Sequence, residues 1–416
     1  MTEKRAAIVA IAALALAGAL ACAWDLALIW DGGAQFCYTL FHGRGYAYGA
    51  RFFSAILWQP VIWAAHLTSD LAILRALYGL PLCLAPAVSA ALSWWMVARS
   101  RPALFPWALM GICAASLPVQ VFIINESVFQ LNVFWPVFVG LLVPLNLPRR
   151  LVIAGLLVFQ FSHPQGLLLL AGATTVLTAL RDDPMFRRRT IFMAALTALC
   201  LVRVLVFSDP EAAQQANIGK AWALFQQGVL GWPLAGGVCV AIAAWTRAKW
   251  PLWLASAAWI WWAIEPTCWV KAMDARRFVI LFAAPFFLGA CRSLRVPASP
   301  EMPRQALCVA LIFATTLTLQ ANGWRSLMNR VIAQVEADPR RVIPVEDFAW
   351  TRGGPADHWG LGPQVIAKLG GRKLVLGEKA REALRRDPPM VEIGYDAWVS
   401  TEPGTLGWFD FRETVH

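Results

Sequence analysis

The stretch that decides the fold is Ala6 to Trp24, which reads AAIVAIAALALAGALACAW. A helix of this length and apolarity can cross the hydrocarbon core of a membrane. Soon after it comes Trp30-Asp31-Gly32-Gly33-Ala34-Gln35-Phe36, which places a carboxylate at the edge of the lipid on one fixed side. The first stretch resembles a signal peptide, but the many apolar segments that follow favour an uncleaved first transmembrane helix.

Composition indicates that lipid is the solvent for most of the chain. Of the 416 residues, 59% are hydrophobic and 15% are charged, whereas a soluble domain carries about a quarter charged residues. The formal charge of +11 does not indicate nucleic acid, because the cytoplasmic loops of membrane proteins collect Lys and Arg. Membrane lipids are therefore expected partners, and nucleic acid is not.

Further apolar segments recur along the chain, separated by short polar loops. They cover residues 73–98, 105–124, 128–145, 151–161, 167–180, 191–207, 229–246, 250–264, 278–290 and 306–323. Every second loop is basic and the loops between are mixed or acidic, which is the positive-inside pattern. The sequence therefore predicts an all-α polytopic membrane domain of about eleven transmembrane helices over residues 1–323, with a cytoplasmic N-terminus.

Residues 324–416 have a different character, with Pro, Gly and mixed charge. Short β-like runs at 341–345, 373–376 and 390–393 flank a helical stretch at 378–386. About 90 residues suffice for a small α/β domain, which the charge pattern places on the extracytoplasmic side. Asp357-His358-Trp359 in its Gly-rich loop favours a turn over a site.

Two of the apolar segments are short for transmembrane helices. Residues 151–161 and 167–180 would rise only about 16 and 21 Å, against roughly 30 Å of hydrocarbon. Their connection, Ser162-His163-Pro164-Gln165, must then lie below the outer membrane surface. Irregular polar backbone at that depth occurs where it lines a protein cavity, so the sequence predicts an outward-facing cavity. His163 is a candidate site residue there, although a lone His is more often structural.

The expected outer loops carry the other candidate residues. A carboxylate such as Asp31 at the membrane edge usually has a function or a partner, and its alternative role is a helix cap. The remaining candidates in these loops are Arg51, Glu126, Lys271, Arg276 and Arg277. Arg203 is a further candidate four residues before the outer end of its span, with the alternative of snorkelling to the interface. Lys271, Arg276 and Arg277 are basic where the chain otherwise avoids positive charge. Their simpler interpretation is that they stop translocation or contact lipid headgroups. We favour a functional role for them.

Three features make the chain similar to the GT-C glycosyltransferases, polytopic enzymes that use polyprenyl-phosphate-linked sugars. The first is the order of residues in the long first outer loop, Asp31, Phe36, Gly43, Gly45, Arg51 and Pro60. The second is the Arg-aromatic-x5-Pro opening of a late span, from Arg277 to Pro285. The third is a polar domain after the last span. The likeness covers the spans up to about Pro285. Asp-Gly-Gly stands where many relatives have two adjacent acidic residues.

The resemblance implies that the chain transfers a hexosyl or pentosyl group from a polyprenyl phosphate to a hydroxyl of a glycan, lipid or protein. Asp31 would be the general base, while Glu126 and His163 would orient the acceptor or tune Asp31. Arg276 and Arg277 would stabilise the leaving phosphate, with Lys271, Arg203 and Arg51 as further substrate-binding residues. The implied location is a bacterial inner membrane, with the C-terminal domain in the periplasm.

No metal or cofactor motif accompanies these residues. CxxC pairs, HExxH and Gly-rich phosphate loops are absent from the sequence, so no cofactor is expected. A divalent metal stays an unsupported alternative. Two other functions stay open, a transporter or flippase of a lipid-linked or anionic substrate and a non-catalytic assembly subunit. A transporter would also place ionisable groups mid-span, whereas here they gather at one side.

Overall fold

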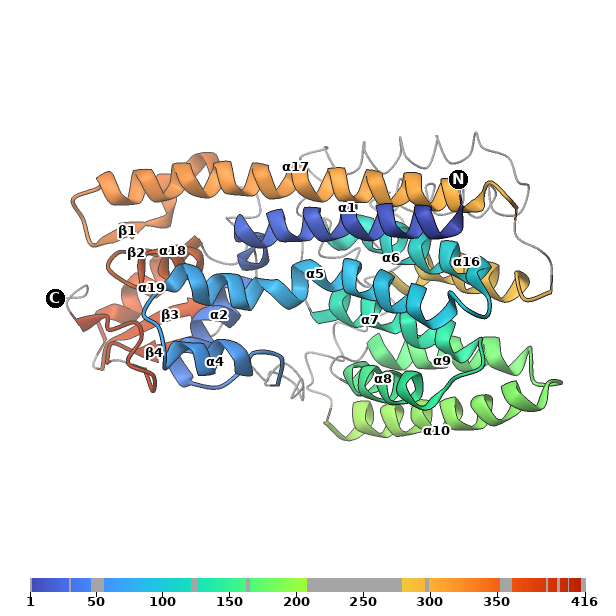
Figure 1. Ribbon diagram of the computed structural model, residues 1–416. Helices are drawn as coiled ribbons and strands as arrows, with labels where there is room; N and C mark the ends of the chain where they lie inside the picture. The colour runs from blue at the N-terminus through green and yellow to red at the C-terminus, as the bar shows by residue number, and fades with distance from the viewer. Residues whose placement is uncertain are drawn as a thin grey trace, which may run out of the picture.

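The computed structural model describes most of the chain as helices, with two small sheets near the C-terminus (Figure 1). The described residues are 2–29, 31–45, 56–120, 126–161, 165–207, 279–295, 299–351, 361–386, 388–394, 397–402 and 404–412. Within them, four helices are long and apolar enough to cross a membrane: α1 (Glu3–Ala23), α5 (Leu71–Val97), α10 (Pro184–Phe207) and α17 (Met302–Ala337). The chain is thus a mainly helical protein of membrane-protein character, as the composition predicts.

Shorter helices fill the bundle between these long ones. They are α6 (Phe105–Gln120), α7 (Glu126–Leu141), α8 (Leu147–Val158), α9 (Gln165–Thr178) and α16 (Val279–Arg292), with 3-10 turns η3 (Pro102–Leu104) and η4 (Phe159–Phe161). They match the expected apolar segments in place. The segments expected at 229–246 and 250–264 lie outside the described residues, so about eleven spans remains a prediction.

Small residues let the first helix lie close to its neighbours. Along α1, Ala10, Ala17, Gly18 and Ala21 are all buried, and the helix packs on α5 and α17. A Cβ added at Gly18 would lie 2.4 Å from the carbonyl oxygen of Cys83 in α5. In lipid the hydrophobic effect does not drive helices together, so close packing of this kind supplies the attraction.

In the described residues of the C-terminal domain, the structure has two separate two-stranded sheets and two helices. Strands β1 (Val342–Pro344) and β2 (Leu374–Leu376) are parallel, and β3 (Met390–Gly394) and β4 (Ala397–Ser400) are antiparallel. Helices α18 (Leu361–Leu369) and α19 (Glu378–Leu384) pack with these strands, and the 3-10 segment η6 (Val345–Thr351) follows β1. The helix α17 runs past Trp324 to Ala337, so the boundary expected at residue 324 falls inside a continuous helix.

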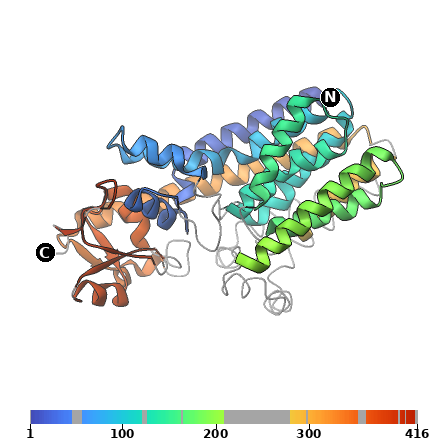
Figure 2. The same ribbon diagram turned by 90° about the horizontal axis from the view of Figure 1, so that it is seen from below.

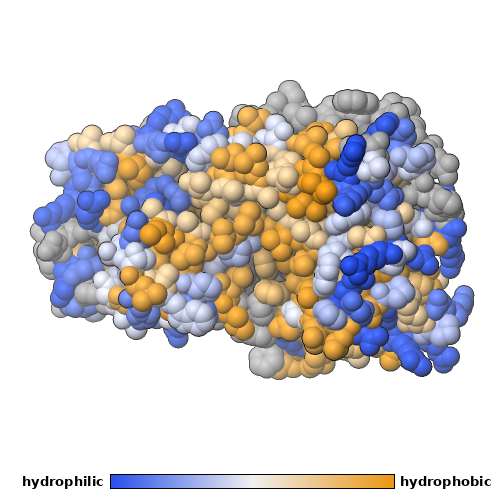
Figure 3. Space-filling view, viewed as in Figure 1, coloured by the Kyte–Doolittle hydropathy of each residue, from blue (hydrophilic) through white to orange (hydrophobic). Residues whose placement is uncertain are grey.

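The two ends of the bundle differ in chemistry. Figures 1 and 2 show the C-terminal domain at one end and the start of α1 at the other. At the end where α1 starts, which we call the arginine-rich end, arginine side chains join separate segments. Arg101 donates to the Leu294 carbonyl (3.4 Å) and Arg295 donates to the Ala179 carbonyl (3.4 Å). In Figure 3 a broad apolar band lies between two ends where hydrophilic residues gather. This banding suits a protein that crosses a bilayer.

Candidate functional site

The structure places the two predicted acidic residues at the starts of helices. Asp31 is the first residue of α2 (Asp31–His42) and Glu126 is the first residue of α7. Both helices begin at the end of the bundle that carries the C-terminal domain (Figure 1). The other predicted site residues Arg51, His163, Lys271, Arg276 and Arg277 lie outside the described residues, as does Asp357-His358-Trp359.

Aromatic and amide groups fix α2 against the start of α5. The Tyr78 hydroxyl donates to Gln35 Oε1 (3.2 Å), and both residues are buried. Phe36 meets the same Tyr78 ring edge-on, with 5.5 Å between ring centroids. On the other side Trp58, which precedes α4 (Gln59–Ala65), stacks on Tyr78 at 4.2 Å. These contacts fix the position of α2 against α5.

The first glycine after Asp31 leaves no room for a side chain, and the second leaves little. A Cβ at Gly32 would lie 1.8 Å from the Ala27 carbonyl oxygen in the preceding 3-10 turn η1 (Leu26–Leu28). A Cβ at Gly33 would lie 3.1 Å from Gln364 Cγ in α18. The structure therefore explains why this chain has Asp-Gly-Gly, because a second carboxylate directly after Asp31 would collide with backbone.

The structure has an ion cluster near α2 that the sequence did not predict. Asp25 accepts from Arg75 Nε (3.1 Å) in α5 and from Lys368 Nζ (2.5 Å) in α18. Arg75 also donates to the Ala367 carbonyl (3.1 Å), and the Trp324 indole donates to the backbone carbonyl of Asp25 (3.0 Å). Asp25 thus ties two spans to the C-terminal domain. The sequence offered one indication of this cluster: a carboxylate directly after the first apolar segment and an arginine early in the second apolar segment.

A second buried polar cluster lies where α8 meets α9. Gln130 in α7 donates to the Gln160 carbonyl (2.8 Å), and Gln160 donates back to the Gln130 carbonyl (3.3 Å). A Cβ at Gly166 would lie 1.8 Å from the same Gln160 carbonyl, so α9 starts tightly against this turn. With 12 and 14 residues, α8 and α9 rise only about 18 and 21 Å. The predicted shortness of these two segments is confirmed.

Arg203 is buried on a helix that is otherwise mostly exposed. The residue is 9% exposed, whereas its helix neighbours Val202 and Leu205 are 54% and 71% exposed. Arg203 lies beside Cys200, one turn earlier in α10. A snorkelling arginine would instead run along the lipid-facing surface, so the burial disfavours that alternative. Ionisable residues that face a membrane bundle's interior usually mark a functional path or site.

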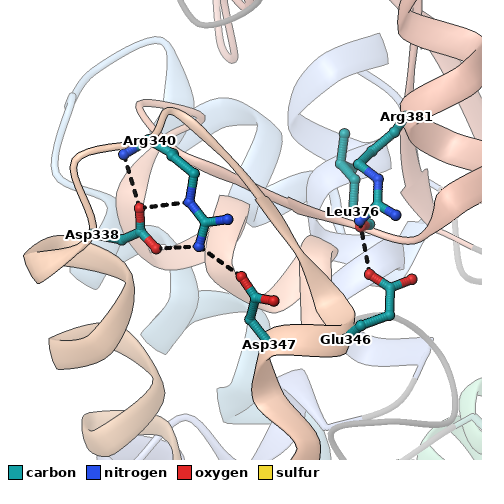
Figure 4. A network of polar contacts seen from close by, with 6 residues as sticks. All are labelled: Asp338, Arg340, Glu346, Asp347, Leu376 and Arg381. Carbon is teal, nitrogen blue, oxygen red and sulfur yellow. Dashed lines mark hydrogen bonds and ion pairs between the residues drawn. The ribbon is translucent and has the colours of Figure 1, made fainter.

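Two arginine networks hold the C-terminal domain's first segment in place (Figure 4). Arg340 pairs with Asp338 (2.7 Å) and Asp347 (2.6 Å), and Arg381 pairs with Glu346 (2.7 Å). Hydrogen bonds from Arg340 lower the pKa of Asp338 to about 2. These residues are exposed or partly exposed and bind one another, so we assign them to fixing β1 and η6 in place and not to chemistry.

The chain matches no protein-family model, no characterised protein and no solved structure. Any function must therefore be argued from its own residues.

Proposed function

We propose that this protein is a membrane glycosyltransferase that moves a sugar from a polyprenyl-phosphate donor to an acceptor hydroxyl at the extracytoplasmic face. The observation that carries the proposal is the setting of Asp31. It opens helix α2, which contacts Tyr78 of α5 and packs on α18 and β3 of the C-terminal domain, and the glycine directly after it is packed against backbone. A carboxylate held in a fixed position at the membrane edge suits a general base that must meet a lipid-linked donor.

The orientation belongs to the same proposal. The arginine-rich end of the bundle faces the cytoplasm, and the C-terminal domain, α2 and the start of α7 face the other side. In a bacterial inner membrane that side is the periplasm. Asp31 and Glu126 then both lie on this outer side, and the short helices α8 and α9 leave room for a cavity there.

The mechanism gives each predicted residue a role. Asp31 takes the proton of the acceptor hydroxyl as the oxygen attacks the anomeric carbon, and the bond to the lipid phosphate breaks. Negative charge then grows on the leaving phosphate, where Arg276, Arg277 and Lys271 provide fixed positive charge. Arg203, buried within α10, and Arg51 complete the donor contacts. Glu126 and His163 orient the acceptor.

The experiment compares two identical changes on the same side of the membrane. Asp31→Asn keeps the shape of the side chain and removes its basicity, so turnover with polyprenyl-phosphate sugars should fall by about two to four powers of ten. Asp70→Asn is the matched control, because Asp70 caps α5 by accepting from Ala72 N (2.7 Å) and Asn caps equally well. Asp70→Asn should keep full activity. Near-normal turnover in Asp31→Asn would leave Asp31 as a helix cap.

A transporter or flippase is the second candidate, and Arg203 is the observation that favours it. An inward-facing cation in a span can line a path for an anionic lipid. Proteoliposomes separate the two functions, since a flippase moves the intact labelled lipid-linked sugar across the bilayer without cleaving it. Sugar transfer to an acceptor, with release of the free lipid phosphate, supports the enzyme. Movement of intact donor with no transfer would replace our proposal with the second candidate.

A further inference from the structure

A groove of about 710 Å³ lies between α8 and α10 at the arginine-rich end of the bundle. It exists because these two helices pack on different partners: α8 packs on α7, and α10 packs on α9 (Figure 1). Arg150, Arg188 and Arg189 line it together with apolar side chains. We call it the α8/α10 groove. It is remote from α2 and plays no part in the proposed transfer reaction.

Among the described residues, acidic groups neutralise the positive charge of the groove arginines only in part. Arg150 donates to the Leu145 carbonyl (3.2 Å) and Arg189 to the Leu141 carbonyl (2.5 Å), so their positions are fixed by neutral acceptors. The charges of Arg150 and Arg189 repel each other, and Asp183 is the acidic group that offsets Arg189. Arg188 is exposed at the groove. A phosphate placed here would relieve the repulsion and accept charge-assisted hydrogen bonds.

The apolar lining begins at the arginines and continues into the apolar band. Leu157 lies seven residues after Arg150 on α8, which is about 10 Å deeper along the helix. Phe192 lies one turn beyond Arg188 on α10 and is 51% exposed, and Ala154 is also exposed. The groove is therefore charged at its outer end and apolar along its length. A free inorganic anion would use only the first part.

We propose that the α8/α10 groove binds an acidic phospholipid. Its phosphate lies on Arg150 and Arg188, and an acyl chain runs along Ala154, Leu157 and Phe192. Charge complementarity selects the anionic headgroup, and the apolar walls select a lipid over a soluble phosphate. Basic pockets between transmembrane helices are suited to anionic headgroups for the same reasons. The site would hold a resident lipid that fills the gap between two helices.

The test titrates the purified full-length protein, in neutral detergent, with phosphatidylglycerol and counts bound lipid by native mass spectrometry. The double variant Arg150→Gln, Arg188→Gln should bind roughly 30-fold more weakly, the combined effect of two arginines at an anionic headgroup. The matched control is Arg181→Gln, Arg187→Gln. It removes the same charge from exposed arginines at the same end of the bundle that do not line the groove. The control should bind as the parent does.

A second variant tests the apolar wall. Ala154→Trp keeps every charge and fills the path of the acyl chain, so binding should fall about tenfold, as if roughly two methylene groups were kept out of the groove. Equal weakening by the control pair would show that general surface charge, and not the groove, attracts the lipid. Unchanged binding by Ala154→Trp, equal affinity for phosphatidylcholine, or displacement of the lipid by millimolar inorganic phosphate would each overturn the proposal.

Discussion

Asp25 and Asp31 both follow the apolar helix α1, but their different surroundings give them different roles. The Asp25 backbone is left-handed (φ 57°), and its carboxylate binds a cation from a span and another from the C-terminal domain. Both carboxylate oxygens are engaged in ion pairs, so this residue acts as an anchor. Asp31 opens the next helix, past the turn that Asp25 starts. The anchor thus sets where the proposed base stands.

Removal of the Asp25 charge tests the anchor. Asp25→Asn keeps a residue that tolerates the left-handed backbone but leaves Arg75 and Lys368, only 13% and 18% exposed, without their countercharge. We expect a loss of about 2 to 3 kcal/mol in the free energy of unfolding, because breaking a largely buried ion pair leaves an uncompensated charge. Thermal unfolding of the purified variant measures it.

The control for the anchor is Asp347→Asn. Asp347 pairs with Arg340, but its side chain is 39% exposed, so its loss should cost at most about 1 kcal/mol. Similar losses in the two variants would mean that Asp25 is no more than another surface partner.

Periodicity explains which elements the sequence predicts and which it does not. Mean hydropathy predicted only the apolar first half of α17, up to about Trp324. The second half is amphipathic. It buries four residues at helical spacing, so the helical period of the sequence could have predicted it: Trp324, Met328, Val331 and Val335. The strands β1, β2 and β3 were predicted because β-branched and apolar residues cluster there. Strand β4 and helix α18 were not predicted.

The first outer loop shows where prediction from the sequence ends. Gly32 and Gly33 have low helix propensity, so Asp31 to His42 did not indicate a helix. The helix forms because Phe36, Cys37 and Gln35 become buried against α5 and α18. Long-range packing of this kind overrides local propensity. For the same reason the sequence selected an acidic residue in this loop but did not show which groups surround it.

Glycines set the spacing between helices α6, α7 and α16. A Cβ at Gly111 would lie 2.0 Å from the Trp135 ring, and one at Gly289 would lie 2.1 Å from the Trp107 ring. Trp135 in turn stacks on Phe287 at 4.5 Å. The indole rings therefore occupy the volume that the missing side chains leave. Interiors packed this densely accept little added volume.

Gly111→Leu tests this packing. The added side chain must displace the buried Trp135 ring, so we expect a loss of at least about 2 kcal/mol, in the upper range for overpacking. Gly172→Leu on α9 is the matched control, because nothing lies within 4 Å of a Cβ at that position. It should be neutral or slightly stabilising, since Leu favours the helix more than Gly does. Thermal unfolding of both proteins decides, and equal destabilisation would contradict the packing argument.

The C-terminal domain and the membrane bundle form one structure. The Thr405 amide donates to the Phe41 carbonyl (2.6 Å), and the Cys37 thiol donates to the Pro363 carbonyl (3.3 Å). Helix α2 therefore lies between the bundle and the domain, with buried contacts to each. Helix α17 joins the two ends as one continuous rod (Figure 1). The domain is a wall of the proposed site, and it must lie on the same side of the membrane as Asp31.

The orientation of the whole molecule can be measured by labelling with an impermeant maleimide in spheroplasts. Ser400→Cys places a thiol on an exposed position of the C-terminal domain, and Arg187→Cys places one at the exposed arginine-rich end. Because basic loops stay in the cytoplasm, Ser400→Cys should be labelled in intact spheroplasts and Arg187→Cys only after permeabilisation. The parent protein corrects for its native thiols, of which Cys308 is exposed. Labelling of Arg187→Cys in intact spheroplasts would place the domain and Asp31 in the cytoplasm, and a donor presented at the outer face could not then reach the site.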